Sequence, residues 1–207
     1  FDILADQAYD HIEPAAARSA AKMRQCGVLC HGSLALRGAS RKAFTEVYNT
    51  TDAPVFLDIN LREPWWSKDT VLDMIQRANI LKLNDAELEI LRPQGLASTP
   101  LAEAVLAARI DWGLDALWLT LGKQGALYCA EGMEPLRVEP DDAQAPVVDT
   151  VGAGDAFSAG ILGGFLKGST PEETAECATR LATRVCGQQG ATSQNPDVYK
   201  GLEAITK

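Results

Sequence analysis

The sequence lacks the features that mark membrane, secreted and nucleic-acid-binding proteins. No apolar run reaches the roughly 18 residues that a spanning helix needs, and residues 1–6 lack the basic start and apolar core of a signal peptide. The five cysteines form no disulfide-like framework. A net charge of -9 argues against a broad phosphate-coating surface. We therefore expect a cytoplasmic protein with free thiols that binds neither membranes nor nucleic acids.

The composition is that of a globular protein, and its 207 residues suit one domain over residues 1–207. Strands are expected at residues 26–31, 54–59, 79–83, 116–120 and 126–129. Helices are expected at residues 41–48, 69–78, 85–91, 100–112, 152–166 and 171–186. This alternation predicts an α/β fold with a mostly parallel sheet covered on both faces. Ligands of such sheets bind beyond the carboxyl ends of the strands.

Residues 149–157 combine small side chains with an acid at a predicted helix start. Gly152, Ala153 and Gly154 allow the backbone to approach a ligand closely. Unpaired amides at a helix start favour a phosphate, and Asp155 in the first turn is placed to take a proton from a hydroxyl. Phosphoryl transfer to an alcohol needs this combination. The alternative is an ordinary helix start with an acidic first-turn residue.

Three other kinds of site fit the sequence less well. Phe157 stands where a dinucleotide fingerprint needs its third glycine, which argues against a nicotinamide-dependent oxidoreductase. Leu117 stands where a P-loop needs its first glycine. A metal site is not expected at Cys26, Cys30 and His31, because no second ligand pair has matching spacing.

Polar residues also follow two other predicted strands. Asp58 and Asn60 lie on one side of a strand end by period two, and Arg62 offers a planar fork for a carboxylate or phosphate. Two interpretations of these three residues are open: they contact the substrate, or they form a salt bridge within the loop. Asn84 has the spacing of a capping box with residue 87. Lys82 either reaches a phosphate or lies at the edge of the core.

The string Asp149-Thr-Val-Gly-Ala-Gly-Asp-Ala-Phe157 closely resembles the C-terminal signature of the PfkB, or ribokinase-like, carbohydrate kinases. The segment 58–66 is similar to the Asp-x-Asn-x-Arg stretch of fructokinases and 2-keto-3-deoxygluconate kinases. The resemblance runs from about Gly32 to Ala191. It implies a ribokinase-like three-layer α/β/α fold with a mostly parallel central sheet. The N-terminal strands and lid are expected to be lacking, since nothing here resembles the family's N-terminal Gly-Gly signature.

The resemblance implies a role for each matching residue of the helix start. Asp155 matches the catalytic base that deprotonates the sugar hydroxyl, and Gly152, Ala153 and Gly154 match the anion hole for the γ-phosphate. The implied partners are a small-molecule sugar and ATP, with Mg²⁺ and a monovalent K⁺ as cofactors. The resemblance also suggests assembly into a homodimer.

Further roles are carried over in the same way. Asn84 and Glu87 match an Asn-x-x-Glu motif that handles phosphate and the water shell of magnesium. The turn along the nucleotide corresponds to Thr120, Gly122 and Gly125, for which a plain hairpin turn is the alternative.

Two more groups complete the implied site. Asp149 and Val151 correspond to positions that help to hold a potassium ion in many family members. The substrate contacts correspond to Asp58, Asn60 and Arg62. The leading hypothesis is phosphorylation of a fructose-like or 2-keto-3-deoxygluconate-like hydroxyl. The alternative is a truncated nucleotide-binding domain without sugar kinase activity on its own.

Overall fold

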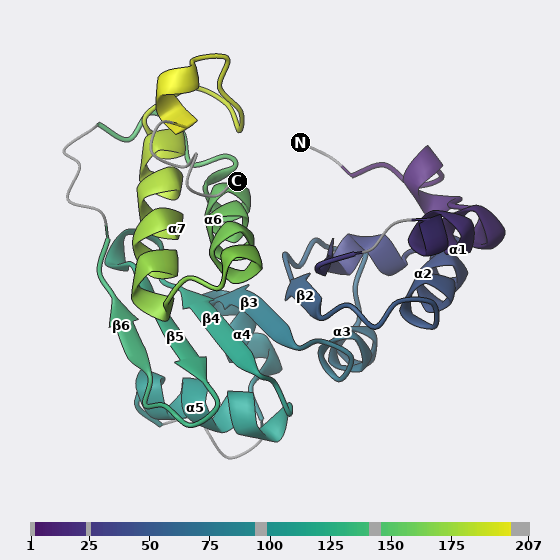
Figure 1. Ribbon diagram of the computed structural model, residues 1–207, viewed down its shortest axis with the longest axis horizontal. Coiled ribbons are helices and arrows are strands. Elements are labelled where there is room, and N and C mark those ends of the chain that lie inside the picture. The colour runs from purple at the N-terminus through teal and green to yellow at the C-terminus, as the bar shows by residue number, and fades with distance from the viewer. Residues whose placement is uncertain (1–2, 24–25, 94–98, 141–145, 200–207) are drawn as a thin grey trace.

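The computed structural model describes residues 3–23, 26–93, 99–140 and 146–199. The strands in these ranges are β1 (Leu29–Gly32), β2 (Val55–Asp58), β3 (Ile80–Asn84), β4 (Ala116–Thr120), β5 (Ala126–Ala130) and β6 (Leu136–Val138). The α-helices are α1 (Pro14–Met23), α2 (Ser40–Tyr48), α3 (Lys68–Ile75), α4 (Asp85–Leu91), α5 (Leu101–Asp111), α6 (Ala153–Lys167) and α7 (Pro171–Cys186) (Figure 1). The 3-10 helices are η1 (Ala8–Asp10), η2 (Ser33–Leu36), η3 (Gly122–Gln124) and η4 (Pro196–Tyr199). Within these ranges no helix combines the length and apolarity needed to cross a bilayer.

The six strands form one sheet in the order β1-β2-β3-β4-β5-β6. Strands β1 to β4 are parallel, and β5 and β6 are antiparallel to their neighbours. The register places Gly32 beside Asp58 and Asp58 beside Lys82. Asn84 lies beside Thr120 in the same way. The polar residues at or near the carboxyl ends of the parallel strands therefore lie side by side along that end of the sheet.

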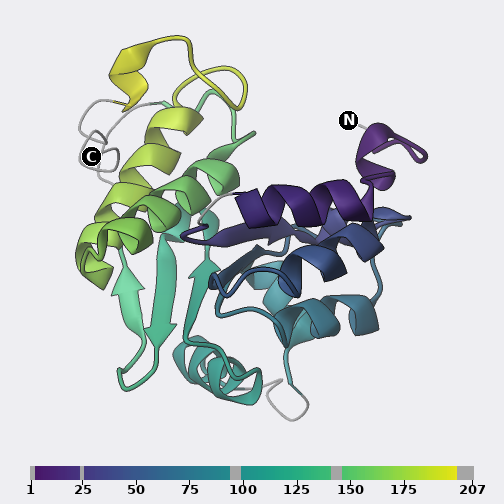
Figure 2. The ribbon, with the colours of Figure 1, turned by 45° about the vertical axis from the view of Figure 1, so that its right-hand side comes forward.

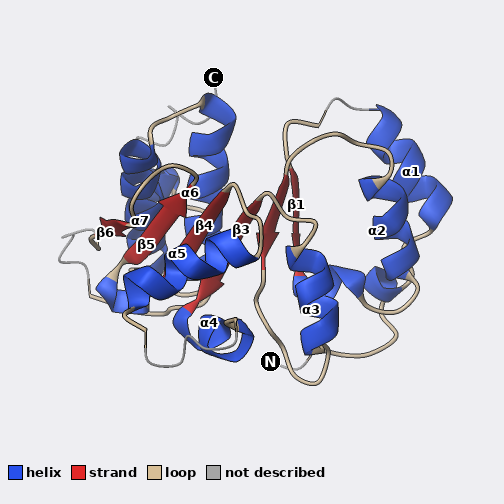
Figure 3. Cartoon of the chain, turned by 90° about the horizontal axis from the view of Figure 1, so that it is seen from below, coloured by secondary structure: helices blue, strands red, loops and turns tan. Residues whose placement is uncertain are grey.

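Helices cover the sheet on both sides, which makes three layers (Figure 3). Helices α3, α4 and α5 enclose one core around Leu57, Leu81 and Leu117. Helices α6 and α7 enclose the other core, in which Trp118 contacts Phe157. Burial on both faces explains why β2 and β3 read as continuous apolar runs in the sequence. The expectation of a three-layer fold with a mostly parallel sheet is confirmed.

The close packing of α6 on α7 fixes where the helix start at residue 152 lies. A Cβ atom on Gly160 would stand 2.4 Å from Cα of Ala178, so only glycine allows this approach of the two helices. Helix α7 begins with a capping box between Thr170 and Glu173. The N-terminus of α6 is thereby held against the carboxyl ends of the parallel strands.

The N-terminal part packs beside β1, where α1 lies along α2 (Figure 2). The Ile12 amide donates to the Ser40 hydroxyl at 2.9 Å. Arg37, which follows η2, forms a buried ion pair with Asp10 of η1 at 2.6 Å. These two interactions join the segment at residues 10–12 to the segment at residues 37–40. They position η2 beside the carboxyl end of β1.

The expected elements differ from the structure at three places. The strand expected at residues 26–31 begins only at Leu29, because its partner β2 begins at Val55, directly after Pro54. Helix α1 was not expected, since alanine dominates it and leaves no apolar period for the sequence to show. Strand β6 has three residues, too few for period two to be recognised.

Candidate active site

A cavity of about 720 Å³ lies at the carboxyl ends of β1 and β2 and at the start of α6. It brings together half of the candidate site residues selected from the sequence. The predicted residues that line it are Asp58, Asn60, Arg62, Val151, Gly152, Gly154 and Asp155. The lining also contains Cys30, His31, Ser33, Thr150 and Ser158, which the sequence analysis did not assign to the site.

Asp155 is exposed to this cavity from the first turn of α6. Gly152 caps the helix with φ 85°, a left-handed conformation that favours glycine. A Cβ atom at this position would stand 2.6 Å from Cα of Ala191, so a side chain is also excluded by packing. The first-turn amides of a helix lack acceptors within the helix itself. The cavity therefore combines an anion-binding helix start with a carboxylate able to accept a proton.

Asp58 belongs to a buried network with Lys82 and Ser158. Nζ of Lys82 donates to both carboxylate oxygens of Asp58 at 3.0 Å. The Ser158 hydroxyl donates to Oδ2 of Asp58 at 2.6 Å and lies 3.1 Å from the Gly154 carbonyl oxygen. A carboxylate has about four acceptor positions, so these three bonds leave one of them for a ligand. The Lys82–Asp58–Ser158 network thus ties β2, β3 and α6 together at the cavity.

Asn60 and Arg62 reach the cavity from the loop after β2. Asn60 has φ 48°, and its carbonyl oxygen accepts from the Ser33 hydroxyl at 3.1 Å. Arg62 is exposed and donates from Nη1 to the Leu61 carbonyl oxygen at 2.9 Å. Its remaining donors are available for an anionic or hydroxyl-bearing group.

Asn84 and Glu87 form the capping box that was one of the two interpretations of their spacing. The Asn84 side chain accepts from the Glu87 amide, and Glu87 accepts in turn from the Asn84 amide, each at 2.9 Å. The other oxygen of Glu87 accepts from the Leu61 amide at 2.8 Å, which fixes the backbone between Asn60 and Arg62. Glu87 is 5% exposed. Its oxygens keep acceptor capacity for a water molecule of a magnesium shell, so the residue fits an indirect rather than a direct metal contact.

The segment from Thr120 to Gly125 joins β4 to β5 through η3. Gly122 and Gly125 have φ of 54° and 81°, both in the left-handed region. A Cβ atom on Gly125 would stand 2.1 Å from the Val138 carbonyl oxygen, so the turn lies directly against the end of β6. The backbone of this segment is therefore that of a turn between two antiparallel strands. Thr120, Gly122 and Gly125 do not line the cavity.

Asp149 organises the loop that precedes α6. One of its oxygens accepts from the Val151 amide at 3.0 Å and the other from the Gly190 amide at 3.1 Å. These two hydrogen bonds hold the pKa of Asp149 below its ordinary value, so the carboxylate stays charged. A charged carboxylate in a backbone loop suits a monovalent cation. Among the described residues, no group of three or more histidine, cysteine or carboxylate side chains has the geometry of a metal site.

His31 enters the cavity wall as a neutral group. Its Nδ1 lies 3.1 Å from the Gly32 carbonyl oxygen, which only accepts, so Nδ1 carries the proton and Nε2 accepts from the Tyr48 hydroxyl. Burial lowers the pKa of His31 and raises the pKa of Tyr48 to about 12. Burial also raises the pKa of the Cys30 thiol, which keeps it protonated. The contacts to Gly32 and Tyr48 occupy both ring nitrogens of His31.

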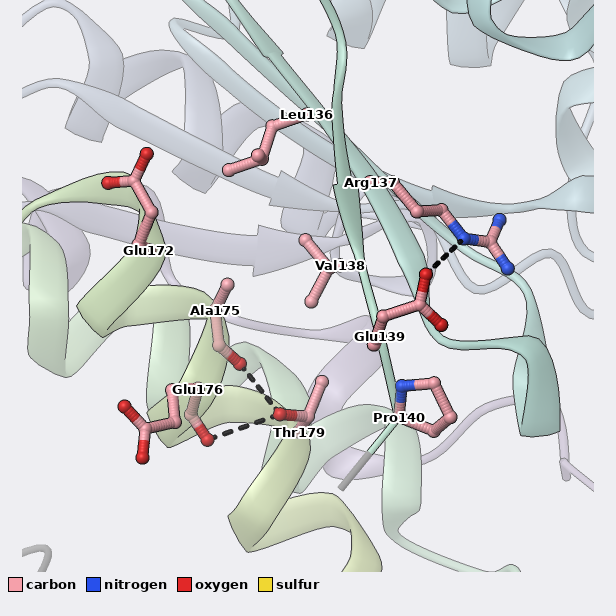
Figure 4. A pocket seen from close by; sticks show the side chains of 9 residues that line it. All are labelled: Leu136, Arg137, Val138, Glu139, Pro140, Glu172, Ala175, Glu176 and Thr179. Atoms are coloured by element: carbon pink, nitrogen blue, oxygen red, sulfur yellow. Dashed lines mark hydrogen bonds and ion pairs between the residues drawn. The ribbon is translucent and has the colours of Figure 1, made fainter. Parts of the chain in front are cut away.

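A second groove, of about 360 Å³, lies between β6 and α7 (Figure 4). Its charged lining is mostly acidic, since Glu139, Glu172 and Glu176 border it and Arg137 is 3.6 Å from Glu139. The Thr179 hydroxyl donates within its own helix, to carbonyl oxygens at 2.9 and 3.1 Å. Such a lining repels phosphate groups, so the cavity at α6 is the better candidate for phosphoryl chemistry.

The sequence is similar to those of known carbohydrate kinases. Residues 6–198 match the profile of the family described as pfkB family carbohydrate kinase. A putative fructokinase-8 of Arabidopsis thaliana is 30% identical over 180 residues, which cover 81% of this chain and 80% of that protein. An ATP-dependent 6-phosphofructokinase of Thermoanaerobacterium thermosaccharolyticum is 30% identical over 152 residues, 71% of this chain but 45% of its own length.

Solved structures give the same result for the fold. A fructokinase from Vibrio cholerae, crystallised with fructose, ADP and a calcium ion, superposes with a TM-score of 0.71 at 25% identity. An aminoimidazole riboside kinase from Salmonella enterica, in complex with aminoimidazole riboside and an ATP analog, gives a TM-score of 0.69 at 26% identity. The superpositions cover 85% and 89% of this chain, and 61% and 64% of those chains.

Proposed function

Because the chain belongs to the pfkB family of carbohydrate kinases, we propose that it transfers the γ-phosphoryl group of ATP to a hydroxyl of a sugar or sugar acid. The observation that carries this proposal is the cavity in which the Asp155 carboxylate and the start of α6 lie together. We assign the reaction to one domain over the described residues, since β1, β2 and α6 all contribute to the cavity.

Asp155 acts as the general base. Its carboxylate accepts the proton of the acceptor hydroxyl while the hydroxyl oxygen forms a bond to the γ-phosphorus. The bond between that phosphorus and the bridging oxygen breaks, and ADP leaves. The helix start at residues 152–154 holds the transferring phosphoryl group, because the positive end of the helix dipole favours its negative charge.

The loop after β2 orients the acceptor. Arg62 and Asn60 line the cavity, and Asp58 has one acceptor position left for a hydroxyl. A planar guanidinium suits a carboxylate or a set of vicinal hydroxyls, which favours a fructose-like or 2-keto-3-deoxygluconate-like acceptor. Thr120, Gly122 and Gly125 lie along the nucleotide.

Two cations accompany the reaction in this proposal. Magnesium would neutralise phosphate charge when bound, and Glu87 together with Asn84 would contact its water shell. Potassium is held by Asp149 and the backbone at Val151. The residues of this chain supply oxygen acceptors of the kind that both ions prefer.

A second candidate is a nucleotide-binding domain without sugar kinase activity on its own. The observation that favours it is length, since the chain spans 61% of the Vibrio fructokinase and 45% of the phosphofructokinase. Calorimetry separates the two functions: a kinase domain gives a sugar-dependent signal beside the nucleotide signal, and a nucleotide binder gives the nucleotide signal alone.

Replacing Asp155 by Asn tests the base directly. We expect Asp155→Asn to lower kcat by about 10²- to 10⁴-fold, because the amide cannot accept the proton, while ADP affinity measured by calorimetry stays close to that of the wild type. Asp69→Asn is the matched control, since Asp69 is an exposed acid in the first turn of α3. An unchanged rate in Asp155→Asn contradicts the proposed role.

A further inference from the structure

The Lys82–Asp58–Ser158 network contains one charged group, the Lys82 ammonium, that the proposed reaction does not use by contact. Lys82 is 4% exposed, and its partners Asp58 and Ser158 are also buried. Asp58, Gly154 and Ser158 line the cavity, and Lys82 lies behind them. A buried ion pair is weak evidence for stability, because removing two charges from water costs about as much as their attraction returns. The position of this one beside the helix start therefore calls for a functional explanation.

Lys82 places its ammonium group against the first turn of α6. A Cβ atom built on Gly154 would stand 3.3 Å from Nζ, so the ammonium lies next to that turn, where a side chain would crowd it. Asp58 is bonded to Ser158, which lies one turn further along the helix. The ion pair is thus oriented, with its cation toward the start of α6 and its anion toward the second turn.

This orientation is unfavourable for α6 by itself. First-turn amides carry partial positive charge, so anions rather than cations stabilise a helix start. A buried ammonium adds positive potential there, and the low effective dielectric of the interior strengthens its effect. The arrangement becomes favourable when a phosphoryl group lies on those amides.

We propose that Lys82 is a positioning residue of the phosphoryl-transfer site. It supplies buried positive charge behind the amides of residues 152–154, and Asp58 and Ser158 hold its ammonium in place. Lys82 acts through the turn at Gly154 and does not contact the substrate. The proposal rests on the proposed function for its kinetic consequence, whereas its effect on anion binding is independent of turnover.

The double variant Asp58→Asn with Lys82→Met tests the charge while keeping the shape of both side chains. In the full chain we expect kcat to fall about 100-fold, the scale of losing one transition-state donor, and the KM for the sugar to rise as well, because Asp58 also lines the cavity where the acceptor binds. Inorganic tripolyphosphate should bind about tenfold more weakly, measured by calorimetry and by the shift in melting temperature. The melting temperature without anion should be equal to or above that of the wild type.

The matched control removes a second buried ion pair of the described residues, with Arg37→Met and Asp10→Asn. These residues lie outside the lining of the cavity, so kcat and tripolyphosphate affinity should stay at wild-type values. A Lys82 double variant with wild-type kcat and wild-type tripolyphosphate affinity overturns the proposal, because a merely structural pair would behave in that way.

Ser158→Ala provides a second variant that keeps both charges. It removes the bond that fixes Asp58 to α6, and we expect kcat to fall roughly tenfold with an unchanged KM for ATP. An unchanged kcat in this variant contradicts the holding role of Ser158. If the wild type transfers no phosphoryl group to any sugar, the proposed function fails, and the tripolyphosphate measurements still decide the role of Lys82.

Discussion

Two buried ion pairs in the described part of the chain use the same chemistry in different surroundings. Arg37 donates to both oxygens of Asp10, at 2.6 and 2.8 Å, and its guanidinium stacks on Trp65 at 4.3 Å and Tyr9 at 4.9 Å. Lys82 donates to both oxygens of Asp58, but its ammonium lies against the first turn of α6 beside a cavity. One cation is enclosed by aromatic rings and a carboxylate, and the other lies beside a helix start.

The difference separates a structural pair from one that is oriented for a ligand. Aromatic faces satisfy the Arg37 charge within the protein, so the pair stabilises the connection between η1 and the residue after η2. At the start of α6 the partial positive charge of the first-turn amides adds to the charge of the Lys82 ammonium. An anion bound there therefore stabilises the folded chain. The surroundings of a buried charge, rather than its burial, indicate which of the two roles it has.

The largest expected effect is on stability when the Lys82–Asp58 pair is broken from one side. Lys82→Met leaves a buried carboxylate without its cation and should cost about 3–5 kcal/mol of unfolding free energy. Adding Asp58→Asn should restore most of that loss, because the buried charge is then gone. Urea denaturation of both variants measures this. A single variant as stable as the wild type would show that Asp58 does not depend on Lys82.

A smaller effect is expected from the hydroxyl that joins the pair to α6. Ser158→Ala removes a 2.6 Å hydrogen bond to a buried carboxylate and should cost about 1–3 kcal/mol. Thr45→Ala serves as the control, since the Thr45 hydroxyl donates only within α2 at an exposed position. Equal losses in the two variants, measured by urea denaturation, would contradict a special contribution of the Asp58 contact.

The smallest effect concerns the response of the Arg37–Asp10 pair to acid. The hydrogen bond from Arg37 holds the pKa of Asp10 below its ordinary value of 3.8. The stabilisation is therefore present above about pH 3.8 and is lost as the pH falls through the lower pKa of the folded state. The difference in unfolding free energy between wild type and Asp10→Asn should shrink in that range. A difference that is constant between pH 7 and the acid limit would mean that Asp10 is not held in this way.

Much of the fold followed from sequence patterns. Helices α4 and α7 begin and end at the expected residues, because the capping boxes at Asn84 and Thr170 mark their starts. The helix start at Gly152 was expected from small residues followed by an acid. The edge of the sheet at which the site lies was also expected, since parallel strands place their carboxyl ends together.

The partners of the site residues were not predictable in the same way. Asp58 pairs with Lys82 because β2 lies beside β3 in a particular register, and no local pattern contains that register. Ser158 lies 100 residues after Asp58 in the chain, so their hydrogen bond depends on how α6 packs. His31 likewise finds Tyr48 only through the packing of α2 on β1. These contacts belong to tertiary structure, and sequence spacing shows only the residues that make them.

The strand order has a consequence for synthesis on the ribosome. Because β1 to β6 pair in the order in which they occur, each new strand adds to the edge left by the previous one, and emerging chains can pair such neighbours as they appear. The strands that hold Asp58 and Lys82 are made long before α6, which supplies Ser158 100 residues after Asp58. The ion pair is therefore buried only once α6 has been made and packs on the sheet.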